Sequence, residues 1–131
     1  PEYTNLVIIE SEQEFWDIVS CAKNSTILLS EVFEHIEKTE AIELVNKIKS
    51  NINFNKIIIT TPDVEFNKYY IDEHGEQINF RHIDHKCEYT QTEFKDIIDD
   101  LFSDSKYTKN FHNIGDMIGT NSITQGYIIS C

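Results

Sequence analysis

The sequence predicts an α/β domain with a mainly parallel sheet and a terminal antiparallel strand. Short runs of apolar and β-branched residues alternate with stretches in which apolar residues recur at helical spacing. Such alternation is typical of a parallel sheet with helices on its faces. The last two predicted strands have no helix between them, so we expect them to pair antiparallel. The 131 residues are enough for one domain, and one is expected over 1–131.

The first part of the chain predicts a strand, a helix and a second strand. Residues 6–9 (LVII) are apolar and indicate the first strand. Residues 11–14 (SEQE) fit a capping box, in which a hydroxyl and a glutamate satisfy N–H groups of the first helical turn. Apolar residues then follow at helical spacing, so the helix is expected to run to about Lys23. Residues 26–32 (TILLSEV) predict a buried strand.

The middle of the chain predicts a helix, a strand and a long loop. Thr39 is expected to cap the helix, whose apolar stripe is Ala41, Leu44, Val45 and Ile48. Residues 56–60 (KIIIT) indicate the next strand. Residues 63–89 are polar and aromatic with weak periodicity, and a loop of this length inside a compact domain is usually functional or disordered.

The last part of the chain predicts a helix and a pair of strands. Residues 90–93 (TQTE) form a second capping box, and apolar residues at helical spacing continue to Phe102. Residues 107–112 and 123–130 indicate the final strands, with a glycine-bearing turn at residues 115–119 between them.

Composition limits the function classes. The formal net charge is −12 with no basic stripe, which argues against an extended nucleic-acid footprint on this chain. An acidic balance suits cation binding and leaves room for one nucleotide at a strand end, although it also simply keeps proteins soluble. The sequence has no apolar run long enough for a membrane span, so no membrane association is expected. Three dispersed cysteines without a signal peptide indicate a reducing compartment, and we expect a cytoplasmic protein.

Two segments carry residues suited to metal chemistry, each at the expected carboxyl end of a strand or beyond it. Glu31, Glu34 and His35 stand at positions i, i+3 and i+4, which share one face if the backbone coils there. Residues 80–89 (FRHIDHKCEY) add imidazole and carboxylate groups from a loop. Oxygen and imidazole ligands without thiolates suit Mg²⁺, Mn²⁺, Fe²⁺ or Co²⁺ better than a structural zinc.

Other interpretations of these residues are open. Acidic residues and a histidine near a helix start also occur as charges on a solvated face that interact with the helix dipole. His82 and His85 can equally be hydrogen-bonded loop residues, as can His74 and His112. A metal-dependent hydrolase using His82, Asp84 and His85 would explain the H-x-D-H pattern. The sequence contains no glycine-rich cofactor or phosphate loop and no G-x-S-x-G elbow.

Three motifs resemble the Hen1 family in the same order. They are EVFEHI at 31–36, TTPDVEFN at 60–67 and FRHIDHKCEYTQTEF at 80–94, and the resemblance extends from about residue 26 to 130 with a Thr-Gln strand at 123–128. It implies the second, metal-binding half of a Rossmann-like methyltransferase. Family members methylate the 2′-hydroxyl of the 3′-terminal nucleotide of RNA, using S-adenosylmethionine and Mn²⁺ or Mg²⁺.

The resemblance also implies roles for particular residues. Glu31, Glu34, His35 and His85 match the family's metal ligands. His82 and His85 are the expected catalytic residues, and His82 is expected to shape the site or act in proton transfer rather than to bind metal. The expected partners are an RNA 3′ end and an RNA-repair protein or a complementing cofactor-binding half.

This sequence departs from the family pattern. Cys87, Tyr89 and Gln91 replace the usual Phe, Trp and Arg, which bears on RNA affinity more than on metal binding. The glycine-rich turn that holds S-adenosylmethionine in the family has no counterpart in residues 1–25. Either the chain is part of a longer protein, or another chain supplies the first half, or methyl transfer has been lost. In the last case the chain would be a non-catalytic partner-binding or metal-binding module.

Overall fold

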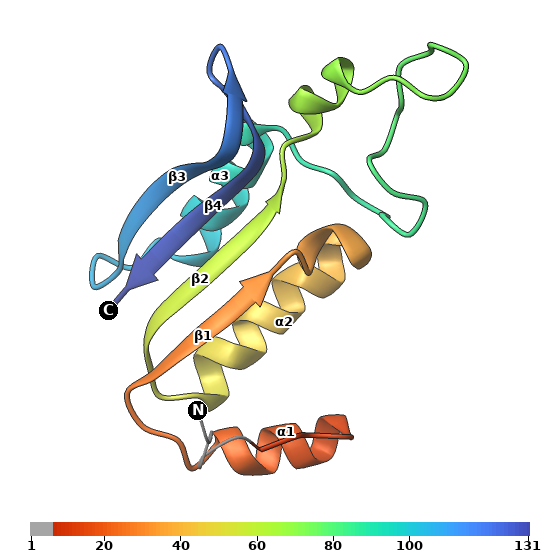
Figure 1. Cartoon of the computed structure of the whole chain (residues 1–131). Coiled ribbons are helices and arrows are strands. Elements are labelled where there is room, and N and C mark those ends of the chain that lie inside the picture. Colours follow the sequence, from red (N-terminus) through yellow and green to blue (C-terminus); the bar gives the residue numbers. More distant parts are fainter. Residues whose placement is uncertain (1–6) are drawn as a thin grey trace, which may run out of the picture.

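The computed structural model describes residues 7–131, in which four strands form one mixed sheet (Figure 1). In spatial order the strands are β1 (Ser25–Ser30), β2 (Phe54–Pro62), β4 (Asn121–Ser130) and β3 (Thr108–Ile118). β1 pairs parallel with β2, whereas β4 pairs antiparallel with both β2 and β3. Three strands therefore run in one direction and the last strand runs in the other, as predicted.

Three helices complete the described fold. They are α1 (Glu12–Val19), α2 (Lys38–Asn51) and α3 (Gln91–Leu101), and two short 3₁₀ turns, η1 (Phe33–His35) and η2 (Val64–Tyr69), follow β1 and β2. Both predicted capping boxes mark helix starts, but only the second is complete: Thr90 and Glu93 bond reciprocally. Ser11 accepts from the N–H of Glu14, whose carboxylate accepts from the N–H of Glu10 instead of Ser11. No helix among these residues is long and apolar enough to cross a membrane.

One hydrophobic core lies between the sheet and the helices α2 and α3. Ile57 and Ile59 of β2 pair across the ladder with Ile129 and Tyr127 of β4, so these four side chains share one face. The helices cover that face with the buried residues Ala41, Val45, Ile48, Phe94, Ile97, Ile98 and Leu101. The core therefore fixes the carboxyl ends of β1 and β2, where the loops that bear the candidate site begin.

The opposite face of the sheet has no helix over it in the described chain. Leu28, Ile58 and Ile128 form a cross-strand row on this face, and Leu28 is 63% exposed. A shallow cavity of about 390 Å³ lies beside the row, lined by Ile58, Thr60, His112, Ile114, Gly126 and Ile128 among others. An apolar surface of this kind on a sheet usually marks a contact with further protein.

Several predicted boundaries are wrong at the N-terminal end. Leu6 lies outside the described residues, and residues 7–9 form no strand, because they pair with none and leave Val7 and Ile8 exposed. The first helix ends at Val19 rather than near Lys23. The strand at 26–32 is an edge strand with one exposed face, and it ends at Ser30 because Glu31 adopts a φ of 52° that turns the chain away.

Further boundaries differ downstream, and both β2 and β4 begin two residues earlier than predicted. α2 begins at Lys38, since Glu37 rather than Thr39 caps it and forms a capping box with Glu40. β3 continues through Gly115, which takes a φ of 83° at an irregularity in the ladder between Ile114 and Met117. The hairpin turn is therefore formed by Gly119 and Thr120 only.

The core packing predicts a large stability loss for Phe33→Ala. The Phe33 side chain is 0% exposed and meets Phe94 edge to face at 6.2 Å, so truncation should lower the free energy of unfolding by about 3–5 kcal/mol. Urea denaturation followed by circular dichroism measures this. Phe80→Ala, at a side chain 47% exposed, is the matched control and should stay within about 0.5 kcal/mol of wild type. Equal losses in both variants would contradict the core described above.

Candidate metal centre

The candidate site lies beyond the carboxyl ends of β1 and β2, where two segments distant in sequence meet. The chain turns out of β1 at Glu31 and coils into η1, and the loop of residues 80–89 lies against it. The backbone N–H groups of Lys86 and Cys87 both donate to the carbonyl oxygen of Glu34, at 2.6 and 3.2 Å. Asp63 also forms a parallel bridge with Tyr89. These backbone contacts hold the loop beside η1.

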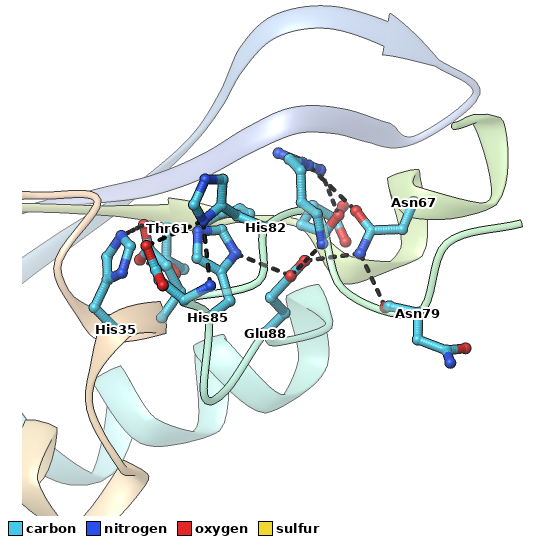
Figure 2. A network of polar contacts seen from close by, with 12 residues as sticks. His35, Thr61, Asn67, Asn79, His82, His85 and Glu88 are labelled. Carbon is cyan, nitrogen blue, oxygen red and sulfur yellow. Dashed lines mark hydrogen bonds and ion pairs between the residues drawn. The ribbon is translucent and has the colours of Figure 1, made fainter. Parts of the chain in front are cut away.

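Glu34, His35 and His85 come together at this junction, and Figure 2 shows the two histidines there. One potential ligand atom from each of the three side chains lies within 4.8 Å of the other two. The rings of His35 and His85 meet edge to face, with centroids 4.8 Å apart. No other set of this kind occurs among residues 7–131. Three of the four predicted ligands are therefore in reach of one cation.

The carboxylate of Glu34 is buried and only partly satisfied. Its Oε2 accepts a hydrogen bond from Thr61 Oγ1 at 3.0 Å, whereas its Oε1 has no hydrogen-bond partner and lies 3.9 Å from His35 Nε2. Burial raises the pKa of Glu34 above its usual value, and the nearby negative charge of Glu31 adds to the shift. A buried carboxylate oxygen without a partner is costly, and a bound cation would remove the cost.

The fourth predicted ligand, Glu31, lies beside this cluster and outside it. Its Oε1 accepts from Thr60 Oγ1 at 2.9 Å, and its backbone N–H donates to the Thr60 carbonyl at 3.0 Å. Its charge is still close enough to raise the pKa of Glu34. The bond to Thr60 occupies one of the two carboxylate oxygens of Glu31.

His82 lies at the exposed rim of the cluster. Its ring centroid is 5.7 Å from that of His85, and its side chain is 58% exposed. The backbone N–H of Asp84 donates to His82 Nδ1 at 3.2 Å, and the Asp84 side chain is itself 72% exposed. His74 and His112 are exposed and lie outside the cluster. The pair His82 and Asp84 therefore makes no compact site with His85.

The most important group that the sequence analysis missed is Glu88. Its side chain is fully buried, and its Oε2 lies 2.9 Å from His85 Nδ1. Asn67 and Arg81, which are also motif residues, bond to Glu88 and to each other. Metal-bound histidines usually donate their second ring N–H to a carboxylate or a carbonyl. A carboxylate three residues after the candidate ligand His85 was therefore a signal in the sequence that could have pointed to Glu88.

The residues that depart from the family pattern take structural positions. Tyr89 is 4% exposed and Cys87 is partly buried against the core. The side chain of Gln91 donates to Asp63 Oδ2 and to the Thr120 carbonyl oxygen, and so connects α3 to the ends of β2 and the hairpin. All three cysteines of the chain are free.

The donor set fits a divalent cation. One buried carboxylate with a free oxygen and two imidazoles match the oxygen and nitrogen preference of Mn²⁺ and related ions. The residues do not fit S-adenosylmethionine in the same way. The four glycines, Gly75, Gly115, Gly119 and Gly126, stand in a loop, at the β3 irregularity, in the hairpin turn and within β4. None forms a glycine-rich turn between a strand and a helix, which is the usual cradle for such a cofactor.

The chain is similar to small RNA methyltransferases in sequence and in structure. It is 30% identical over 107 residues to the small RNA 2′-O-methyltransferase of Arabidopsis thaliana, which is 74% of this chain and 11% of that protein. Among solved structures it matches a chain of the Pnkp1/Rnl/Hen1 RNA repair complex at 36% identity and a TM-score of 0.66, over 81% of this chain and 22% of that one. No protein-family model matches the chain.

A second structure has a higher structural similarity. The crystal structure of the small RNA methyltransferase HEN1 matches with a TM-score of 0.74 and 25% identity, over 87% of this chain and 14% of that chain. The chain thus spans about a tenth to a fifth of the length of these proteins and has a methyltransferase fold. The sequence motifs, the structural match and the curated relative agree, and the chain belongs to the Hen1-like family.

Proposed function

We propose that this chain is the metal-binding half of an enzyme that methylates the 2′-hydroxyl of the 3′-terminal nucleotide of RNA. The observation that carries the proposal is the cluster of Glu34, His35 and His85, with one buried carboxylate oxygen left without a partner. The relatives named as small RNA 2′-O-methyltransferases support the reaction class. The formal net charge of −12 and the lack of a basic stripe in the sequence agree with recognition of a strand end rather than of a long RNA segment.

The proposed ligands are Glu34, His35 and His85, and Glu31 is proposed to join them through a carboxylate oxygen. Mn²⁺ or Mg²⁺ is the proposed ion. When bound, such an ion supplies a positive charge that lowers the pKa of a coordinated hydroxyl group. Glu34 contributes the anionic oxygen that attracts the ion, and the two imidazoles fix its position from opposite segments of the fold.

His82 is proposed to shape the rim of the site. Its Nδ1 accepts from the backbone N–H of Asp84 and lies 3.5 Å from Asp84 Oδ2. These contacts hold Nδ1, so Nε2 is the ring nitrogen left to contact an oxygen of the RNA end.

S-adenosylmethionine is proposed to bind to a complementing half that lies outside this chain. The open sheet face with Leu28, Ile58 and Ile128 is where that half would pack. The structural match to a chain of an RNA repair complex suggests an RNA-repair protein as a further partner. The cytoplasm is the proposed location.

The second candidate function is a non-catalytic partner-binding or metal-binding module derived from such a methyltransferase. The lack of a glycine-rich cofactor turn in the sequence favours it. The sequence also left open a metal-dependent hydrolase that would use His82, Asp84 and His85. The structure disfavours this function, because His82 and Asp84 are exposed and lie outside the cluster. Methyl transfer by a completed enzyme separates the first two candidates.

Metal binding is the first expected outcome. Titration with Mn²⁺ by calorimetry should show one site, and Glu34→Ala and His85→Ala should each weaken binding by more than about 100-fold. This exceeds the loss caused by removing an outer-shell partner of a metal ligand, about 10- to 100-fold. His74→Ala, at a side chain 77% exposed in the same loop, is the matched control and should bind like wild type. Unchanged affinity in Glu34→Ala would rule out the site.

Without metal, the stability of the protein should depend on the ionisation of Glu34. The pKa of Glu34 is raised in the folded state, so protonated Glu34 stabilises the fold fully at pH values below the usual glutamate pKa of 4.5. This contribution is lost as the pH rises through the pKa of Glu34 in the folded protein. In chelator, Glu34→Gln should therefore be more stable than wild type at pH 7 to 8, and the difference should shrink toward pH 4. Urea denaturation across this pH range measures the difference.

Bound metal should reverse the order of stability of wild type and Glu34→Gln. At 100 times its dissociation constant, Mn²⁺ should stabilise wild type by about 2.7 kcal/mol and leave Glu34→Gln nearly unchanged. Glu76→Gln, an exposed change of the same kind in the loop, is the control for both experiments. A Glu34→Gln protein that is less stable than wild type in chelator at pH 8 would contradict a buried, uncompensated charge.

Methyl transfer is the third expected outcome. The chain joined to the cofactor-binding half of a Hen1 relative should transfer labelled methyl groups from S-adenosylmethionine to an RNA with a 3′-terminal ribose. An RNA ending in a 2′-deoxy nucleotide should accept none, since the acceptor oxygen is missing. Glu34→Ala should reduce the rate by at least about 100-fold if metal loss removes a large electrostatic contribution. Absence of transfer in a folded, metal-binding fusion would favour the non-catalytic module.

A further inference from the structure

Glu88 stands behind His85 and has no exposed surface on its side chain. Each of its two carboxylate oxygens is held by a separate donor. Oε1 accepts from Asn67 Nδ2 at 2.7 Å, and Oε2 accepts from the backbone N–H of Arg81 at 2.6 Å (Figure 2). The same Oε2 lies 2.9 Å from His85 Nδ1. The carboxylate is thus fixed on one side by the protein and presents its remaining acceptor capacity to the imidazole.

Asn67 and Arg81, which bond to Glu88, are fixed by further hydrogen bonds. Asn67 Nδ2 also donates to the carbonyl oxygen of Asn79 at 3.3 Å, and Asn67 Oδ1 accepts from Arg81 Nε at 3.2 Å. The guanidinium of Arg81 donates from Nη2 to the Asp63 carbonyl at 3.1 Å. This network ties the loop to the carboxyl end of β2, so Glu88 cannot follow a change in His85 without breaking several bonds.

The contact determines which nitrogen of His85 carries the hydrogen. A carboxylate only accepts hydrogen bonds, so His85 Nδ1 must donate and Nε2 keeps its lone pair. His82, three residues earlier in the same loop, has no such partner: its Nδ1 accepts from the N–H of Asp84 and lies 3.5 Å from Asp84 Oδ2, on a side chain that is 72% exposed. Of the two histidines, whose ring centroids are 5.7 Å apart, only His85 is therefore held by a buried carboxylate.

We propose that Glu88 is a positioning residue that selects His85, and not His82, as the metal-binding histidine of this loop. It does so by holding the His85 ring in place and by leaving Nε2 free to bind a cation. The inference rests on the proposed metal site, to which it adds the reason why one of two neighbouring histidines serves as ligand. Glu88 itself touches neither metal nor substrate.

Nitrogen NMR of the imidazoles in metal-free protein tests the inference directly. With the rings in their neutral form, wild type should show His85 with its hydrogen on Nδ1. Glu88→Ala removes the acceptor of His85 Nδ1, so the His85 signals should move toward the other tautomer while those of His82 stay in place. Mn²⁺ affinity should fall by about 10- to 100-fold. Glu76→Ala, at an exposed glutamate of the same loop, is the matched control and should change neither readout.

The possible outcomes separate the inference from the proposed function. If wild type fails to bind Mn²⁺, the proposed function fails, and the tautomers still decide whether Glu88 sets His85. If wild type binds Mn²⁺ but His85 carries its hydrogen on Nε2, the inference is overturned while the metal site stands. The same holds if Glu88→Ala leaves both the tautomer and the affinity unchanged. The wild-type spectrum alone decides the question should Glu88→Ala fail to fold.

Discussion

The buried carboxylate of Glu34 is the constraint around which the site is organised. Its side chain is shielded from water, one oxygen is paired with Thr61 and the other has no partner. A buried, half-satisfied carboxylate destabilises a fold unless a cation or a proton compensates it. The surrounding structure keeps it in place all the same, because the Glu34 carbonyl accepts two backbone bonds from the 80–89 loop and Phe33 anchors the turn in the core. The buried carboxylate thus lowers the stability of the fold at the point where two imidazoles converge. Such locally unfavourable arrangements are common at functional sites.

The elements of the fold were largely predictable because their signals are local. The hydroxyls of Ser11 and Thr90 and the alternation of apolar residues need only a few neighbouring positions to be read. The errors arise where tertiary context decides. Nothing in its own sequence shows that β1 lies at the sheet edge with Leu28 exposed. Thr39 was the expected cap of α2, but Glu37 forms a capping box with Glu40 and the helix begins at Lys38.

The site was predictable in its composition and only partly in its geometry. The spacing of Glu34 and His35 and the family motif around His85 led to three residues that the structure brings together. Glu31 was grouped with them on the assumption of a regular helical turn, but its positive φ directs the side chain to Thr60. The role of Glu88 was hidden, because a buried bond to His85 Nδ1 depends on how the long loop folds back, which neither spacing nor periodicity reveals.

Anomalous diffraction from a crystal of the protein soaked in Mn²⁺, recorded at the manganese edge, tests the central claim most directly. The account predicts one strong peak, bounded by Glu34 Oε1, His35 Nε2 and His85 Nε2, with the bond between His85 and Glu88 intact. A peak on another acidic part of the surface, or none in a well-ordered crystal, would contradict it. In that case the free oxygen of Glu34 would have to be explained by a proton rather than by a metal ion.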